Sequence, residues 1–217
     1  MDTPQFTPAL GYHWLTPIYD SALALMARER LWREQLLRQV APKPGDVIID
    51  VGCGTGSFVT LLKAAEPGAT VIGVDPDGDV LELARRKAAK SNSDITFKQG
   101  FLSENLLEGQ PRPNKIVSSL VFHQVLLAEK RRLLKLIRSL LPQSGELHIA
   151  DYGLQRTHTM RLLFRMTVQL LDGVRDTQPN ADGVLPEIMQ EVGFGTVEEL
   201  KVIPTVTGSI SLYRAKP

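Results

Sequence analysis

The stretch Asp46–Asp75, DVIIDVGCGTGSFVTLLKAAEPGATVIGVD, decides how this chain folds. It opens with a short apolar, β-branched run at 47–51, which is typical of a strand covered on both faces. Glycines follow at once, and then apolar residues recur at the spacing of one helix face until Pro67-Gly68. A second apolar strand at 70–74 stops on Asp75. The pattern predicts one βαβ unit with a right-handed crossover.

The glycines at 52, 54 and 56 indicate a ligand above the first strand. A tight turn from strand to helix needs positive φ or close backbone approach, and glycine permits both because it has no Cβ. The helix that begins at Gly56 directs free N–H groups toward such a ligand. Asp75 stands where a carboxylate at the tip of the second strand can accept hydrogen bonds from both hydroxyls of a ribose. The sequence therefore predicts a nucleotide-like ligand.

The spacing of the glycines separates two classes of nucleotide. Dinucleotide-binding proteins use G-x-G-x-x-G, whereas this chain has G-x-G-x-G with Ser57 next. Asp50, two positions before Gly52, would repel a pyrophosphate and favour a ligand with a positive group. A nicotinamide-dependent oxidoreductase is therefore the less favoured alternative.

The run Asp50–Gly56, DVGCGTG, resembles the first motif of the class I S-adenosylmethionine-dependent methyltransferases, and Asp75 matches the acidic residue that ends their second strand. The closest group is the small-molecule methyltransferases of the ubiquinone and menaquinone type (type 11/25). The resemblance is clear over about residues 45–152 and extends in outline to the rest. It implies S-adenosyl-L-methionine as cofactor and methyl transfer to a small, apolar or aromatic acceptor. A catalytically silent binding or scaffold protein of the same fold is the alternative.

Composition sets limits on the protein's class. A chain of 217 residues with 43% hydrophobic and 23% charged residues suits one soluble core, and a net charge of +1 gives no reason to expect nucleic acid. We expect no membrane span, no secretory signal and no metal site, because no long apolar run or metal-ligand spacing is present. The single cysteine, Cys53, suits a reducing cytoplasm, and its place in the turn favours a small packing residue over a nucleophile.

Downstream, strands and helices alternate, which predicts an α/β fold with a doubly wound, Rossmann-like, mostly parallel sheet and helices on both faces. The resemblance implies seven strands, the last antiparallel. We expect the later strands at 95–99, 115–121, 146–152, 196–203 and 206–215. Helices are expected at 76–89, before 142, at 157–171 and at 185–191, with a polar loop at 172–182. The methyltransferase core would be 45–217, with a helical insertion at about 154–182.

In the helix before Pro142, the apolar face is formed by Leu133, Ile137, Leu140 and Leu141, and Lys130 is expected largely off it. Residues 157–171 are apolar nearly all round, so they must be covered on more than one side. They could cover the substrate pocket or form a homodimer with a second copy.

The first 44 residues are expected to form an N-terminal helical cap, with a helix at 22–40. The resemblance implies that this cap folds over the cofactor, with Tyr12 and Tyr19 nearest to it; the alternative is that these aromatics cap the sheet edge. In the turn after the third strand, Phe101 replaces the acidic residue that this family often places against adenine. We therefore expect contacts from the backbone and ring there. The predicted cofactor-binding residues are Tyr19, Asp50, Gly52, Cys53, Gly54, Gly56, Asp75, Pro76, Gly100, Phe101, Leu102, Ser119 and Leu120.

Two residues are candidates for catalysis on the acceptor side, His123 after the fourth strand and Tyr152 at the end of the fifth. A base is needed only if the acceptor must first lose a proton, and His123 suits that role near neutral pH; alternatively it shapes the pocket. His148 is expected in the core, His158 on the surface, and His13 is a secondary candidate. The segment 119–122 lacks the Asn/Asp-Pro-Pro-aromatic tetrapeptide of many N-methylating relatives, which favours O- or C-methylation.

Overall fold

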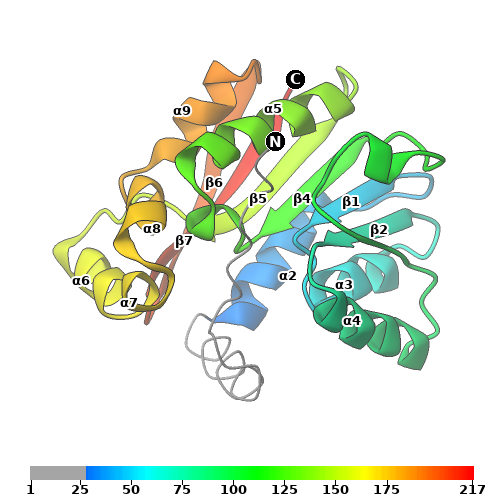
Figure 1. Ribbon diagram of the computed structural model, residues 1–217, viewed down its shortest axis with the longest axis horizontal. Coiled ribbons are helices and arrows are strands. Elements are labelled where there is room, and N and C mark those ends of the chain that lie inside the picture. The colour runs from blue at the N-terminus through cyan, green and yellow to red at the C-terminus, as the bar shows by residue number, and fades with distance from the viewer. Residues whose placement is uncertain (1–27) are drawn as a thin grey trace.

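The computed structural model describes residues 28–217, and these build one seven-stranded sheet in the order β3-β2-β1-β4-β5-β7-β6 (Figure 1). Only β7 runs antiparallel to its neighbours, β5 and β6. This confirms the predicted doubly wound sheet with an antiparallel last strand. The strands are β1 Val47–Val51, β2 Thr70–Asp75, β3 Thr96–Gln99, β4 Lys115–Ser119, β5 Glu146–Tyr152, β6 Thr196–Thr205 and β7 Gly208–Lys216.

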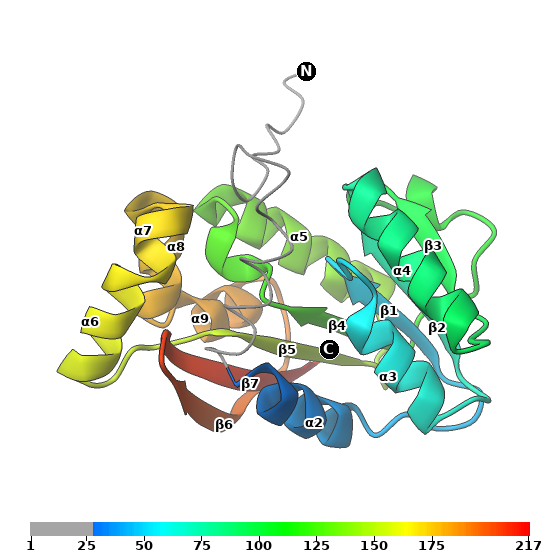
Figure 2. The ribbon, with the colours of Figure 1, turned by 90° about the horizontal axis from the view of Figure 1, so that it is seen from below.

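Helices cover both faces of this sheet (Figures 1 and 2). One face carries α2 (Glu29–Val40), α3 (Ser57–Ala65) and α4 (Gly78–Lys90), and the other carries α5 (Leu127–Leu140) and α9 (Val184–Glu191). The alternation of side chains along a strand produces these two cores. Ile48 of β1 packs in the cluster with Trp32 of α2, whereas the next residue, Ile49, packs in the cluster with Ile137 of α5.

The sheet changes direction of winding at β1, which pairs in parallel with β2 on one side and β4 on the other. Ile49 lies opposite both Ile72 and Ile116, so the carboxyl ends of these three strands fall close together. Ligands of open α/β sheets bind in the crevice at such a switch point. The loops that follow β1, β2 and β4 therefore define the candidate site.

Strand β4 ends at Ser119, two residues earlier than the sequence predicts. Leu120 takes a left-handed conformation (φ 56°) while its N–H still donates to Ala150 O at 2.9 Å. This conformation costs about 1–2 kcal/mol for a residue other than glycine. It turns the chain into the short 3-10 helix η2 (Phe122–Gln124), which carries His123.

The predicted single helix at 157–171 is wrong, because the chain forms two helices, α6 (His158–Met166) and α7 (Val168–Asp172). The break lies at Thr167, with φ −118° and ψ −80°. Its hydroxyl donates to Leu163 O at 2.6 Å, a local bond that competes with the helix. Neither glycine nor proline marks the break.

The predicted polar loop at 172–182 is also wrong, because residues Val174–Ala181 form helix α8 despite Pro179. Contacts from distant parts of the chain hold it: Asn180 Nδ2 donates to Tyr152 O, and Lys130 Nζ donates to Asp176 O, both at 2.9 Å. Lys130 was expected largely off the apolar face of its helix, yet its side chain is fully buried. Its ammonium also donates to a carbonyl at the end of η2.

Residues 154–182, between β5 and α9, thus hold α6, α7 and α8; we call this segment the insertion. In Figure 1 it lies beside the end of β5. Its two ends meet, because Gln155 N–H donates to Ala181 O at 2.9 Å. The Gln155 side chain fixes this neck to the sheet by donating to Ser209 O and accepting from Ser209 N.

The last hairpin differs from the prediction in its turn, since β6 continues through Pro204 to Thr205. Proline is tolerated there because β6 is an edge strand.

Strand β3 begins at Thr96, and η1 (Asn105–Leu107) follows it. In the part of the chain that the structure describes, no helix combines the length and apolar character needed to span a bilayer. The predicted helix at 22–40 is seen as α2 from Glu29, and its part before Arg28 lies outside the described residues, as do Tyr12, His13 and Tyr19.

Candidate functional site

The glycine loop after β1 has positive φ at Gly52 (74°), Gly54 (51°) and Gly56 (73°). A Cβ on Gly52 would overlap Val121 Cγ2, and one on Gly56 would lie 2.8 Å from Ala84 Cβ. A Cβ on Gly54 would meet no atom of residues 28–217 within 4 Å. The outer two glycines are therefore required by packing, and Gly54 presents open backbone on the side where a ligand is expected.

Asp50 lies under this loop as a buried carboxylate, with 1% of its surface exposed. Within residues 28–217 neither of its oxygens has a hydrogen-bond partner. Burial raises the pKa of Asp50 to about 7; the charge of Asp75 adds to this rise, while the Arg33 guanidinium opposes it. An unpaired buried carboxylate costs several kcal/mol unless a partner is supplied, so the position favours a cationic ligand group.

Arg33 is a candidate site residue that sequence reasoning missed, because a lone arginine on a helix resembles any surface charge. It lies on α2, forms an ion pair with Glu29, and its positive charge lowers the pKa of Asp50. Its Nε is buried and has no hydrogen-bond partner in the described part of the chain. The loop thus has an anionic and a cationic side chain beside it.

Asp75 lies at the end of β2, where the sequence places it, and it holds the loops together. One oxygen accepts the Gly54 N–H at 2.9 Å and the other accepts the Asp77 N–H at 3.0 Å. Burial raises its pKa, and these two N–H donors oppose the rise. Each oxygen keeps a lone pair for a ribose hydroxyl, which stays a prediction, as does contact from the neighbouring half-buried Pro76.

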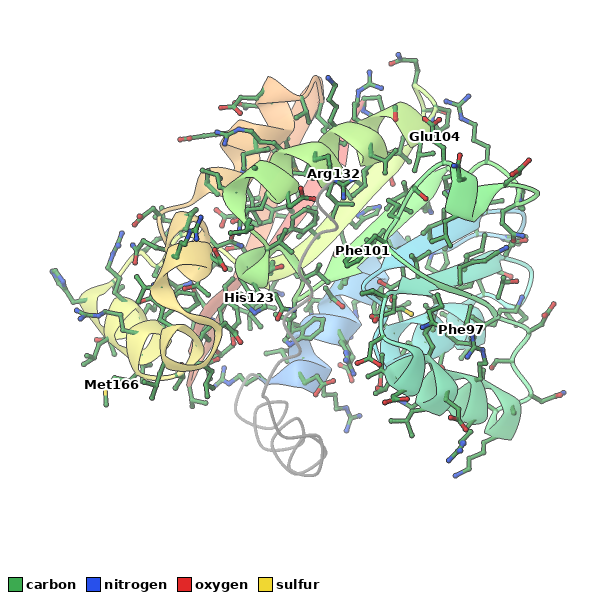
Figure 3. All side chains as sticks on the ribbon, viewed as in Figure 1. Phe97, Phe101, Glu104, His123, Arg132 and Met166 are labelled. Carbon is green, nitrogen blue, oxygen red and sulfur yellow. The ribbon has the colours of Figure 1, made fainter. Side chains whose placement is uncertain are left out.

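The turn after β3 reaches the same place, because Gly100 N–H donates to Asp75 O at 2.9 Å. Leu102 is buried, whereas Phe101, labelled in Figure 3, is 46% exposed. Ser119, which ends β4, and Leu120, which follows it, are half-buried nearby. The structure therefore brings the predicted cofactor residues between 50 and 120 to one edge of the sheet.

Cys53 packs inward beneath the glycine loop. Burial, together with the negative charges of Asp50 and Asp75, raises the pKa of its thiol. The thiol therefore stays protonated at neutral pH, which supports the packing role over the nucleophilic one.

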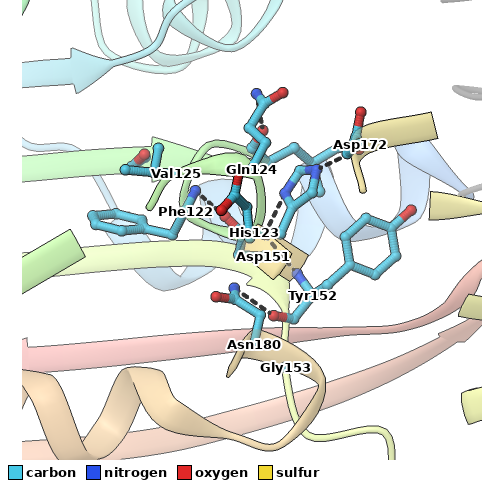
Figure 4. Close-up of polar contacts among 12 residues, drawn as sticks. Phe122, His123, Gln124, Val125, Asp151, Tyr152, Gly153, Asp172 and Asn180 are labelled. Carbon is cyan, nitrogen blue, oxygen red and sulfur yellow. Dashed lines mark hydrogen bonds and ion pairs between the residues drawn. The ribbon is translucent and has the colours of Figure 1, made fainter. Parts of the chain in front are cut away.

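On the other side of the switch point, His123 lies between two carboxylates (Figure 4). Its Nδ1 is 2.8 Å from Asp151 Oδ1, and its Nε2 is 3.5 Å from Asp172 Oδ2. Asp151 also accepts the backbone N–H groups of Phe122 at 2.6 Å and Tyr152 at 2.8 Å. The buried carboxylate therefore fixes the ends of both β4 and β5 around the imidazole.

These contacts set the protonation of His123. Burial favours the neutral ring, but the charges and hydrogen bonds of Asp151 and Asp172 outweigh it and raise the pKa of His123 to about 9. At neutral pH the ring is therefore an imidazolium that donates hydrogen bonds, and it must lose a proton before it can act as a base. Sequence reasoning proposed His123 but missed both partners, which lie 28 and 49 residues further along the chain.

Tyr152 places its ring between two others. Its centroid is 5.1 Å from that of His123, nearly edge-on at 77°, and 5.1 Å from that of Phe164. Its hydroxyl lies 2.7 Å from Thr207 Oγ1. Tyr152 thus contributes an aromatic wall, and its catalytic role stays a prediction.

Two further histidines lie as expected, His148 in the core and His158 on the surface. Over residues 28–217 no three His, Cys, Asp or Glu side chains are grouped so that they could hold a metal ion. The predicted cofactor and acceptor sides adjoin where Gly52 packs against Val121.

Comparison with known proteins agrees with this geometry. The family model described as "Methyltransferase domain" matches residues 42–192, more than half of the chain. An uncharacterized methyltransferase of Bacillus pumilus is 28% identical over 167 residues, 74% of this chain and 75% of that protein. One of Anoxybacillus flavithermus is 30% identical over 118 residues, 54% of this chain and 52% of that protein. The chain thus spans about half of the latter relative.

Other similarities are shorter or more remote. A demethylmenaquinone methyltransferase of Symbiobacterium thermophilum is 47% identical over 62 residues, 28% of this chain and 24% of that protein. Magnesium protoporphyrin IX methyltransferase from Synechocystis, solved with bound SAH, has a TM-score of 0.66 at 20% identity and covers 87% of this chain and 83% of its own. Human N-acetylserotonin methyltransferase in complex with SAM has a TM-score of 0.64 at 16% identity, and the match covers 89% of this chain and 54% of that chain. At these identities the two structures show a shared fold.

The sheet order, the Asp50–Gly56 motif at its switch point and the domain match point to the same family. The protein belongs to the methyltransferase domain family, as a class I S-adenosylmethionine-dependent member.

Proposed function

We propose that this protein transfers a methyl group from S-adenosylmethionine to a small acceptor with an apolar or aromatic body. The observation that carries the proposal is Asp50, a buried carboxylate whose two oxygens lack a partner in residues 28–217, beneath the open backbone of Gly54. A ligand with an ammonium group satisfies that carboxylate.

The residues fit the parts of this cofactor. Asp50 is suited to bind the ammonium group of the cofactor's amino-acid part, and Arg33 is suited to bind its carboxylate. Asp75 retains acceptor capacity for the ribose, and Phe101 offers a ring beside the expected adenine position. When bound, the cofactor supplies a methyl group on a cationic sulfur.

The acceptor side is best formed by η2, the end of β5 and the insertion. Tyr152 and Phe164 provide an aromatic wall, and His123 provides a charged hydrogen-bond donor beside it. Methyl transfer is an in-line displacement, for which alignment of the reacting atoms can contribute about 7–11 kcal/mol. These side chains orient the acceptor and exclude water, and His123 as an imidazolium orients an acceptor oxygen.

Calorimetric titration with S-adenosylmethionine, S-adenosylhomocysteine and NADH tests the cofactor part. Micromolar binding of the first two, without binding of NADH, is expected. The acceptor part is tested with cofactor labelled in the methyl group and a library of small phenols, carboxylic acids and amines. Cofactor binding without label transfer to any library compound would support the scaffold alternative. Binding of NADH alone would support the oxidoreductase alternative.

We also propose that the protein forms a homodimer through α6 and α7. Leu162, Met166 and Leu170 recur every four residues and are 55%, 65% and 77% exposed, and Figure 3 shows Met166 at the edge of the molecule. Light scattering should give twice the chain mass for the wild type and the single mass for Leu170→Glu. A wild type that stays monomeric at every concentration contradicts this.

A further inference from the structure

The two carboxylates beside His123 differ in how firmly they are held. Asp151 is fully buried within β5 and accepts two backbone N–H groups as well as the imidazole. Asp172 belongs to the insertion, where it ends α7, and 24% of its side chain is exposed. The contact from Asp172 to Nε2 is 3.5 Å, compared with 2.8 Å from Asp151 to Nδ1 (Figure 4).

The Asp172 carboxylate has few contacts other than the one to His123. In the described part of the chain, His123 is the only group with which its carboxylate forms an ion pair. Gly173 follows with φ 83°, a conformation that separates α7 from α8. Among residues 28–217, the Asp172 carboxylate therefore has no second ion pair to break when it leaves Nε2, whereas Asp151 is also held by two backbone N–H groups.

We propose that Asp172 is a positioning residue that occupies the place of the acceptor oxygen, and that the acceptor is an oxyanion, a phenolate or enolate, that replaces it at His123 Nε2. This inference rests on the proposed methyl transfer and names the substrate class. An anionic oxygen matches the negative charge of the carboxylate it displaces, and Nε2–H then donates to that oxygen.

The reaction balances without a base. The anionic oxygen forms a bond to the methyl carbon as the bond from that carbon to sulfur breaks, so the negative oxygen and the positive sulfur are both neutralised. His123 keeps its proton throughout. The methylated oxygen, now uncharged, binds the imidazolium more weakly, and Asp172 returns to Nε2.

Other charged groups around η2 are consistent with this exchange. Lys130 of α5 donates to main-chain oxygens of Val125 and Asp176, and its charge interacts with Asp151 and with the Asp176 carboxylate of α8. The Tyr152 hydroxyl lies beside Thr207. The titration of His123 therefore depends on the titratable groups around it, which are Asp151, Asp172, Asp176, Lys130 and Tyr152.

Nuclear magnetic resonance tests the inference before any acceptor is known, because the chain has only four histidines. In the wild type at pH 8, the ¹⁵N shifts of His123 should show protons on both ring nitrogens, with the signal assigned by His123→Gln. In Asp172→Asn the titration midpoint should fall by about one pH unit, the lower end of the effect of a nearby opposite charge. The matched control is Asp182→Asn, an exposed carboxylate that pairs with Arg161 and should leave the midpoint unchanged.

Anion binding provides the second readout, with 4-nitrophenolate as the probe and 4-nitroanisole as its uncharged counterpart, both in the presence of S-adenosylhomocysteine. Because one pH unit corresponds to a factor of ten, Asp172→Asn should bind the phenolate up to about tenfold more tightly and the anisole equally well. An unchanged His123 midpoint, or equal gains for both probes, would overturn the inference. Failure to bind S-adenosylhomocysteine would instead overturn the proposed function, while the titration of His123 would still decide the role of Asp172.

Discussion

Gly52→Ala and Gly54→Ala form a matched pair that separates packing from ligand binding in the glycine loop. Both residues have positive φ, which costs an alanine about 1–2 kcal/mol. At Gly52 the new methyl group would also overlap Val121, and overpacking adds about 1–3 kcal/mol. At Gly54 the methyl group would meet no atom of the described residues within 4 Å.

The free energy of unfolding without ligand should therefore fall by about 2–5 kcal/mol in Gly52→Ala and by about 1–2 kcal/mol in Gly54→Ala, as measured by urea denaturation. Calorimetry with S-adenosylhomocysteine should show a larger loss of affinity in Gly54→Ala than in Gly52→Ala. Gly54→Ala should lose at least about tenfold in affinity, because the methyl group enters the space where the ligand must approach the backbone.

Two results would refute this reasoning. Equal destabilisation of both variants would mean that the contact between Gly52 and Val121 does not constrain the loop. Wild-type affinity in Gly54→Ala would mean that the ligand does not lie against Gly54, and the assignment of the cofactor to this loop would fail with it.

Asp75→Ala should weaken S-adenosylhomocysteine binding by about 1.5–3 kcal/mol, the scale of a lost charge-assisted hydrogen bond, and unchanged affinity in calorimetry would contradict the ribose role. Folding raises the pKa of Asp50 to about 7. Between about pH 4 and pH 7 the folded chain therefore keeps a proton on Asp50 that the unfolded chain has already released. The free energy of unfolding should fall as pH rises through that window; urea titrations of Asp50→Asn should show a flatter slope, and an identical slope would contradict the burial argument. Lys130→Met should destabilise the fold by about 2–4 kcal/mol, because two carbonyl oxygens lose a charged donor, whereas exposed Lys135→Met should stay within about 0.5 kcal/mol; equal unfolding curves would contradict this.

The parts of the fold that follow from the sequence are those decided by neighbouring residues. The βαβ unit of Asp46–Asp75 was predicted almost to the residue, because apolar runs, glycines and Pro67-Gly68 mark each boundary. The same local signals located β5 and α9. They also identified His123, since it directly follows a buried strand.

What the sequence could not predict depends on contacts between distant segments. Helix α8 contains Pro179 and looks like a loop until Lys130 and the carbonyl of Tyr152 supply its partners. The break at Thr167 has no sequence marker, because a threonine hydroxyl bonds equally well within a continuous helix. In the same way, nothing near Asp172 or Arg33 in the chain indicates that each lies beside a site residue.

The neck of the insertion has a consequence for how proteins of this kind could diversify. The chain leaves the sheet and returns to it at one hydrogen-bonded point, from Gln155 to Ala181. Loop closure constrains the length of the segment between these residues only weakly, and inside it Asp176 and Asn180 bond back to Lys130 and to Tyr152 of β5. In the proposed function the acceptor contacts come from the insertion and the cofactor contacts from the sheet edge, so a new acceptor could be acquired by replacing residues 156–175 while Asp176 and Asn180 are kept.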